Sequence, residues 1–196
     1  MNPEPGRLEI GAALFVDLMS ELARRGGGTR ESGAFLLQDA HPELAGDGAG
    51  WQAVTAVAYY GDLDPGSLTG NITFSASGYT ALASRCRAEG WRIAADIHTH
   101  PGRWVHQSHT DATHPMVALP GHVALIAPSF AQGPVAISDL GAHVYQGNGQ
   151  WTSRFGPDVA RVLRLTETPA ATPLRARLAS WFLHRARRLL TPWRSR

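Results

Sequence analysis

The 196-residue chain has no lysine and a single cysteine, Cys86. One cysteine cannot form an internal disulfide, so we expect a reducing, cytoplasmic setting. No apolar run reaches the roughly 18 residues that a membrane-spanning helix needs, and the polar, proline-containing start does not have the pattern of a secretory signal. Disulfide-scaffold and membrane-spanning classes are thereby excluded. The composition, 43% hydrophobic and 17% charged, is typical of one globular domain.

All 18 basic residues are arginines, and they are unevenly distributed along the chain. Residues 1–153 contain 8 arginines and 14 acidic residues, whereas residues 154–196 contain 10 arginines and 2 acidic residues. We therefore expect a domain over residues 8–153 and an Arg-rich linker and amphipathic helix over residues 154–196. This helix has two interpretations. It packs its apolar face on the domain or on a second copy, or it contacts anionic surfaces such as a membrane or nucleic acid, without DNA specificity.

The spacing of apolar residues predicts a mixture of helices and strands. Ile10, Leu14, Leu18 and Leu22 recur at helical spacing and indicate an amphipathic helix before Gly26. A second helix is expected over residues 77–89. Short apolar runs predict strands over residues 33–38, 51–60, 91–98, 121–130 and 133–145. This order favours an α+β domain built around one sheet.

Five of the nine histidines lie between positions 98 and 114, and two of them suit a metal site. His98 and His100 end a predicted strand, where residues two apart point to the same face. Ser108 is a good helix N-cap, and Asp111 lies on the same side of the first helical turn. Two imidazoles and one carboxylate leave the fourth tetrahedral position of a zinc ion open, as in catalytic zinc sites.

A hydrolytic zinc site also needs a general base, and the best-placed candidate is Glu31. It is the only acidic residue between Glu21 and Asp39, and it directly precedes Ser32 and a predicted strand. From position alone, an ordinary exposed carboxylate at the start of a strand is the better interpretation of Glu31.

Together these residues form a long, spaced pattern. Glu31 before an apolar strand, His98-x-His100-Pro and Ser108-x-x-Asp111 resemble the JAMM motif of the MPN (JAB) metalloprotease family. The resemblance implies an MPN-type mixed sheet flanked by helices, with one catalytic zinc held by His98, His100 and Asp111. It further implies that Glu31 is the base that later protonates the leaving amine, and that Ser108 donates a hydrogen bond to the oxyanion.

The resemblance also implies a substrate class. Members with this motif hydrolyse the peptide or isopeptide bond after the C-terminal glycine of a ubiquitin-like protein. We therefore expect a prokaryotic, deubiquitinase-like enzyme that acts on such a protein or its conjugates, beside the activating and conjugating enzymes of that system, in antiphage defence. An alternative with the same chemistry is the processing of a ubiquitin-like sulfur-carrier protein for cysteine or cofactor synthesis. The absence of lysine has two interpretations. An enzyme that works beside a lysine-modifying conjugation system would offer that system no acceptor side chain, or the absence only reflects GC-rich coding.

Residues near the motif have more than one interpretation. Asp96 alternates onto the same strand face as His98, where it can orient an imidazole. His122 is expected to be structural, and Trp104 either faces the substrate or packs within its loop. Tyr59 and Tyr60 are expected in the core or at a sheet edge. The following residues either tune substrate contacts or are solvated surface: His106, His109, Thr110, Thr113 and His114.

Overall fold

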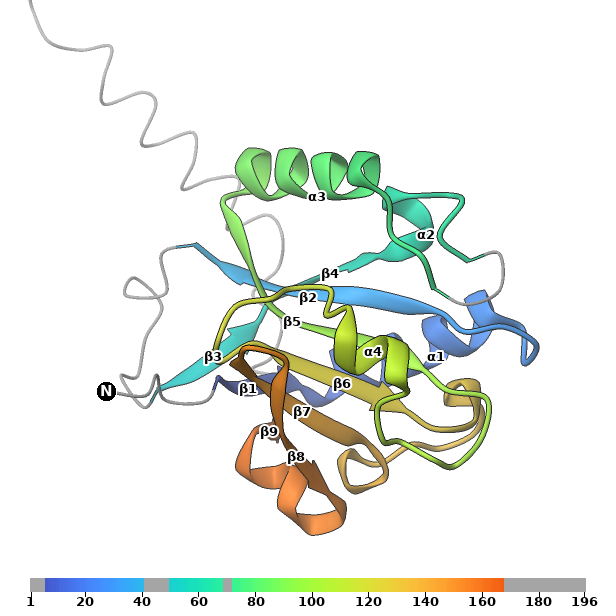
Figure 1. Cartoon of the computed structure of the whole chain (residues 1–196). Helices are drawn as coiled ribbons and strands as arrows, with labels where there is room; N and C mark the ends of the chain where they lie inside the picture. The colour runs from blue at the N-terminus through green and yellow to red at the C-terminus, as the bar shows by residue number, and fades with distance from the viewer. Residues whose placement is uncertain (1–5, 41–49, 69–71, 168–196) are drawn as a thin grey trace, which may run out of the picture. The chain divides into compact units, whose positions relative to one another are not determined.

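The computed structural model describes residues 6–40, 50–68 and 72–167 (Figure 1). The chain divides into two compact units, Met1–Thr166 and Glu167–Arg196. Every element described below belongs to the first unit. No helix in the described part of the chain is long and apolar enough to cross a membrane.

The first unit is an α+β fold with two sheets, as the apolar spacing predicts. The larger has six strands in the order β4-β2-β5-β6-β7-β8, in which only the β5–β6 pair is parallel. The smaller is the parallel sheet β3-β1-β9. The strands are β1 (Arg7–Gly11), β2 (Gly33–Asp39), β3 (Trp51–Val54), β4 (Ala56–Tyr59), β5 (Trp91–Thr99), β6 (Val123–Ala127), β7 (Gly141–Gly147), β8 (Gln150–Phe155) and β9 (Leu163–Thr166).

The helices lie around these sheets, and most of them are short. The α-helices are α1 (Ala12–Gly26), α2 (Tyr60–Leu63), α3 (Ala76–Glu89) and α4 (His109–Thr113). The described residues also include the 3-10 helices η2 (Ser129–Ala131), η3 (Ile137–Asp139) and η4 (Gly156–Arg161).

Strand β2 separates two hydrophobic cores, because its side chains alternate between the faces of the sheet. Ala34 and Leu36 join the core that contains Leu18 and Leu22 of α1. Phe35 and Leu37 point to the opposite face and join the core that contains Leu82 of α3. Burial on both faces explains why β2 is continuously apolar rather than alternating. Figure 1 shows α3 covering one face of the sheet.

The structure differs from the sequence expectation at both ends of the unit. Ile10, expected in the first helix, lies in β1, because that segment pairs in parallel with β3 and β9. The boundary expected after residue 153 falls within β8, and the compact unit continues through η4 and β9 to Thr166. The strand expected over residues 133–145 begins only at Gly141. The predicted C-terminal helix lies outside the described residues.

Gly33 generates the first testable prediction, because it faces the buried ring of Tyr60. A Cβ added there would lie 2.8 Å from the carbonyl oxygen of Ile97 and closer still to that ring. We expect Gly33→Ala to lower the free energy of unfolding by about 1–3 kcal/mol, since overpacking of a filled core is destabilising. Urea denaturation measures this change.

Gly26→Ala is the matched control, because a Cβ there would meet only the Ser32 side chain, at an ordinary 3.6 Å. It should be neutral or slightly stabilising. Equal stability of Gly33→Ala and the native protein would show that the ring of Tyr60 does not require this glycine.

Candidate metal and catalytic site

The side chains of the two motif histidines project from the end of β5 on the same face of the sheet. His98 lies within β5 and His100 directly follows it, and they are only 8% and 6% exposed. Their Nε2 atoms are 3.2 Å apart. Two imidazole lone pairs at this separation repel each other unless a proton or a cation lies between them. The strand geometry therefore creates a place for positive charge.

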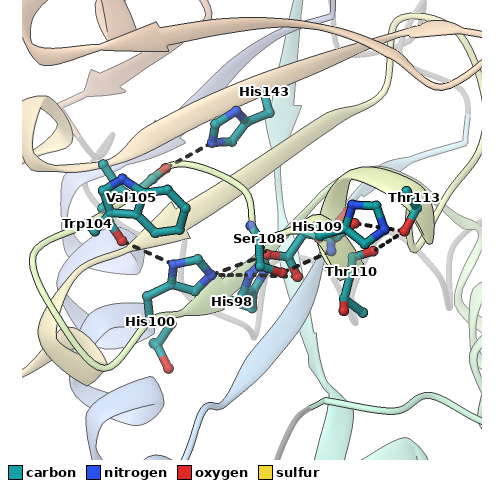
Figure 2. Close-up of polar contacts among 12 residues, drawn as sticks. His98, His100, Trp104, Val105, Ser108, His109, Thr110, Thr113 and His143 are labelled. Atoms are coloured by element: carbon teal, nitrogen blue, oxygen red, sulfur yellow. Dashed lines mark hydrogen bonds and ion pairs between the residues drawn. The ribbon is translucent and has the colours of Figure 1, made fainter.

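Asp111 reaches the same place from the first turn of α4. Ser108 is the N-cap of this helix: its Oγ accepts a hydrogen bond from the Asp111 amide, and its own amide donates to Asp111 Oδ2 at 2.7 Å. This capping box fixes the carboxylate. Asp111 Oδ1 lies 3.6 Å from His98 Nε2, and Oδ2 lies 3.4 Å from His100 Nε2. Figure 2 shows the two imidazoles pointing toward this helix.

The spacing of the three side chains fits a small tetrahedral ion. Donor atoms about 2.0–2.1 Å from a tetrahedral zinc are about 3.3–3.4 Å from one another. Here the two Nε2 atoms are 3.2 Å apart, and the Asp111 carboxylate approaches them with different oxygens, Oδ2 at 3.4 Å from His100 and Oδ1 at 3.6 Å from His98. One ligand atom from each of the three residues lies within 4.8 Å of the other two. Imidazole nitrogen and carboxylate oxygen are also donors that zinc prefers. His98, His100 and Asp111 could therefore hold one divalent metal ion together.

The charges in the cluster are already arranged for a cation. Burial would raise the pKa of the Asp111 carboxyl, but its interactions with His100 and His98 outweigh burial and hold this pKa well below its ordinary value. Burial would lower the pKa of His100, yet contacts with Asp111 and the Trp104 carbonyl raise it overall. Asp111 thus remains ionised, and its negative charge favours any cation between the imidazoles.

Glu31 lines the same cleft as the three donors. It is positioned by its neighbour Ser32, whose amide donates to Thr99 Oγ1 at 3.0 Å and whose hydroxyl donates to the Leu22 carbonyl at 2.8 Å. Gly33 in turn pairs with His98 across the sheet. Burial is the main cause that raises the pKa of Glu31, and it outweighs the opposing influence of His98 and His100.

The start of the loop between His100 and α4 is hydrogen-bonded to η2, a turn with an unusual backbone conformation. Ser129, Phe130 and Ala131 have φ of 52°, 53° and 57°, which non-glycine residues rarely adopt. In this conformation the Phe130 amide donates to the His100 carbonyl, and the Ser129 amide donates to the Gly102 carbonyl. Backbone strain is thus located directly behind a candidate metal ligand, as is common at functional sites.

The cleft around the cluster has a volume of about 730 Å³ and bulky walls. Trp104 is 58% exposed and stacks on His100, with 6.1 Å between the ring centroids. Two hydrogen bonds fix other lining residues: Trp151 Nε1 donates to the Ala112 carbonyl, and the Tyr79 hydroxyl donates to the Met116 carbonyl. Trp104 therefore both packs within its loop and faces the cleft.

Some functional candidates differ from the sequence expectation. Asp96 also lines the cleft, but the imidazole that it orients belongs to His122, at 2.6 Å, and not to a motif histidine. Tyr60 donates to the other oxygen of Asp96. Sequence spacing could not reveal this pair, because its members come from β5 and from the residue directly before β6. The only sequence signal was a carboxylate within an otherwise apolar strand.

The remaining flanking residues are divided between packing and surface. His106 stacks between Trp104 and Phe155. Tyr60 is fully buried, and Tyr59 is half-buried. His106 is nevertheless exposed, and so are His109, Thr110, Thr113 and His114.

Comparisons with known proteins point in the same direction as the cluster. No family model matches the chain. The chain is 29% identical over 77 residues to a probable metalloprotease, y4jG, of Sinorhizobium fredii, and the match covers 39% of this chain and 47% of that protein. The chain thus spans about half the length of this relative. The similarity is thus to part of a probable metalloprotease.

Solved structures support the fold alone. Protein DSY2949 of Desulfitobacterium hafniense superposes with a TM-score of 0.55 at 18% identity, covering 83% of this chain and 95% of that one. A protein from Salinibacter ruber superposes with a TM-score of 0.50 at 16% identity, covering 85% of this chain and 95% of that one.

The buried His143 of β7 generates a prediction about pH. Burial is the main cause that lowers its pKa from 6.5 to about 4. Between these values the unfolded chain binds a proton that the folded chain does not, so stability falls as the pH drops from about 6.5 to about 4. The loss is at most about 3 kcal/mol.

Urea denaturation between pH 7.5 and pH 4.5 tests this contribution. The His143→Gln variant should lose less stability than the native protein across the range, because Gln does not titrate. His109→Gln, at an exposed position, should keep the native slope. Parallel pH curves for the native protein and His143→Gln would contradict the prediction.

Proposed function

We propose that this chain is a zinc-dependent peptidase of the JAMM type. The observation that carries the proposal is the meeting of two buried imidazoles and one ionised carboxylate, with separations of 3.2 to 3.6 Å, in a cleft that Glu31 also lines. Similarity to a probable metalloprotease supports the same reaction class. His98, His100 and Asp111 would hold the metal.

The chain's own residues supply the acid–base steps. When bound, zinc would act as a Lewis acid that makes water more acidic and polarises a carbonyl. Glu31 would take a proton from the attacking water and later give it to the leaving amine. Its raised pKa suits both tasks, because a half-buried carboxyl holds and releases a proton nearer to neutral pH.

Ser108 would stabilise the oxyanion of the tetrahedral intermediate. Its oxygen accepts the Asp111 amide in the capping box, which uses a lone pair and leaves the hydroxyl proton free to donate. The backbone position of Ser108 is fixed by the same box. A donor held in this way is typically worth about 2.7–4 kcal/mol in the transition state.

The proposed substrate is the C-terminal glycine segment of a ubiquitin-like protein, in peptide or isopeptide linkage. Bulky side chains form the cleft walls, among them Phe74, Trp104 and Trp151. An extended segment without side chains, such as a Gly-Gly end, passes between such walls with the least steric conflict. A conjugated ubiquitin-like protein and a sulfur-carrier protein with the same ending present the same chemistry. Partners in the conjugating system and a role in defence belong to this proposal.

Metal binding is the first requirement of this function. Zinc at 100 times its Kd should stabilise the native protein by about 2.7 kcal/mol, because it binds only the folded state. His98→Ala and Asp111→Asn should abolish the resulting rise in Tm in a thermal melt.

Asp139→Asn is the matched control, because Asp139 also accepts a backbone amide at a helix start, that of Ala136, but does not belong to the cluster. It should keep the zinc-dependent rise. A native protein whose Tm does not respond to zinc would contradict the proposed metal centre.

Glu31→Gln tests the proposed base. The variant should bind zinc with native affinity and lose about 10²–10⁴-fold in kcat/KM, since only proton transfer is removed. The assay uses a fluorogenic amide attached to the C-terminal glycine of a ubiquitin-like modifier, and in a parallel arm to that of a sulfur-carrier protein.

Glu89→Gln, at the exposed end of α3, is the control and should retain native rates. Full activity of Glu31→Gln would remove the proposed mechanism. Zinc-loaded native protein that cleaves neither probe would overturn the proposed substrate class.

A further inference from the structure

His143 lies outside the motif, yet its hydrogen bonds define its protonation form. It is 1% exposed and pairs with Ser153 across β7 and β8. Its Nε2 lies 3.0 Å from the carbonyl oxygen of Val105, and its Nδ1 lies 2.8 Å from Ser153 Oγ. A carbonyl oxygen can only accept, so Nε2 carries the proton. Nδ1 of the neutral ring then accepts from the serine hydroxyl.

Val105 is the residue after Trp104, whose carbonyl oxygen accepts from His100 Nδ1 at 3.1 Å. This bond fixes the proton of His100 on Nδ1 and leaves the Nε2 lone pair directed toward His98 and Asp111. Figure 2 shows both contacts: His143 reaches the Val105 carbonyl, and the Trp104 carbonyl reaches His100. Two consecutive peptide groups therefore connect His143 with a candidate metal ligand.

Close packing against β7, in addition to the hydrogen bond from His143, positions the loop that contains Val105. At Gly141 a Cβ would lie 2.9 Å from His143 Nε2 and closer still to the Val105 oxygen, so only glycine admits the loop. Phe155, opposite Gly141 in β8, contacts both His143 and His106. The loop backbone thus rests on β7 and β8 at one defined point.

We infer that His143 is a positioning residue of the metal centre. His143 fixes the position of the Val105 carbonyl by a hydrogen bond. The adjoining peptide group, which carries the Trp104 carbonyl, is thereby also fixed, and this carbonyl orients His100 toward the metal. The inference rests on the proposed function, because it assumes that His100 is a ligand. It means that a residue of β7, which lies outside the motif, contributes to metal affinity.

The experiment measures metal binding rather than hydrolysis. His143→Leu removes the donor to Val105, whereas His143→Gln keeps an N–H that can reach it. Zinc affinity is measured by competition with a chromophoric chelator, and the visible absorption of the Co²⁺-loaded protein reports ligand geometry. We expect His143→Leu to weaken zinc binding by about 10–100-fold and to change the cobalt spectrum. His143→Gln should restore both to near native values.

Tyr145→Phe is the matched control on the same strand. It removes a polar contact, from the Gly149 amide to the tyrosine hydroxyl, away from the loop. It should leave zinc affinity and the cobalt spectrum native, so a general loss of stability cannot mimic the effect. Native affinity and an unchanged spectrum in folded His143→Leu would overturn the positioning role alone.

A measurement on the native protein avoids the risk that His143→Leu does not fold. Nitrogen-15 NMR distinguishes the two neutral imidazole forms. We expect the proton of His143 on Nε2 and that of His100 on Nδ1. A proton on Nδ1 of His143 would overturn the inference, whatever the variants do. Native protein that binds neither zinc nor Co²⁺ would instead overturn the proposed function, and the positioning role with it.

Discussion

The antiparallel pairing of β2 with β5 is the constraint on which the site depends. It places Gly33 opposite His98 and lets Ser32 bond to Thr99 through both its carbonyl and its amide. Glu31 is thereby brought to the candidate ligands although it lies far from them in the chain. Because side chains alternate along a strand, a slip of one residue would turn His98 to the opposite face. The two Ser32–Thr99 hydrogen bonds and the close approach of Tyr60 and Ile97 to Gly33 oppose such a slip.

Local polar contacts around the cluster serve the helix and the site together. The Ser108–Asp111 capping box satisfies orphan amides at the start of α4, a helix of 5 residues that is too short to be stable alone. The same box presents one carboxylate to two imidazoles. Removing Asp111 therefore affects two things at once, the helix start and the charge that makes the imidazole pair tolerable. This coupling explains why the asparagine variant, which keeps the cap acceptor, separates them better than alanine.

Much of the candidate site was accessible from the sequence because its rules are local. The i, i+2 alternation of His98 and His100 and the i, i+3 relation of Ser108 and Asp111 predicted which side chains would meet, and the structure brings them together. Their roles as ligands and donor stay predictions. Glu31 required the family resemblance, since no local rule connects it to β5. The α+β class was also predicted, and it is confirmed.

The features that escaped prediction all depend on pairing between distant segments. Strands β1 and β9 form a parallel pair from opposite ends of the unit, and β1 is short enough to be read as the start of the following helix. The contact between His143 and Val105 joins β7 to a loop, and the one between Asp96 and His122 joins β5 to the residue directly before β6. Neither leaves a spacing signal. In the sequence, Asp96 and His143 stand out only as single polar residues within apolar segments.

The partner of each buried imidazole, rather than its place in the sequence, determines what it can do. His98 and His100 share one carboxylate and keep their Nε2 atoms directed at a common point, which suits a cation. His122 faces the carboxylate of Asp96 and has no place in that cluster. Among the described residues, the hydrogen-bond partners of His143 are a carbonyl and a hydroxyl, and burial lowers its pKa, so it remains neutral and holds a loop. The crowding of histidines along the chain is therefore a poor guide to the site, because it includes residues that do not take part and misses one that does. Exposed His109 is near the motif without contributing to the cluster, whereas distant His143 contacts the loop that orients a candidate ligand.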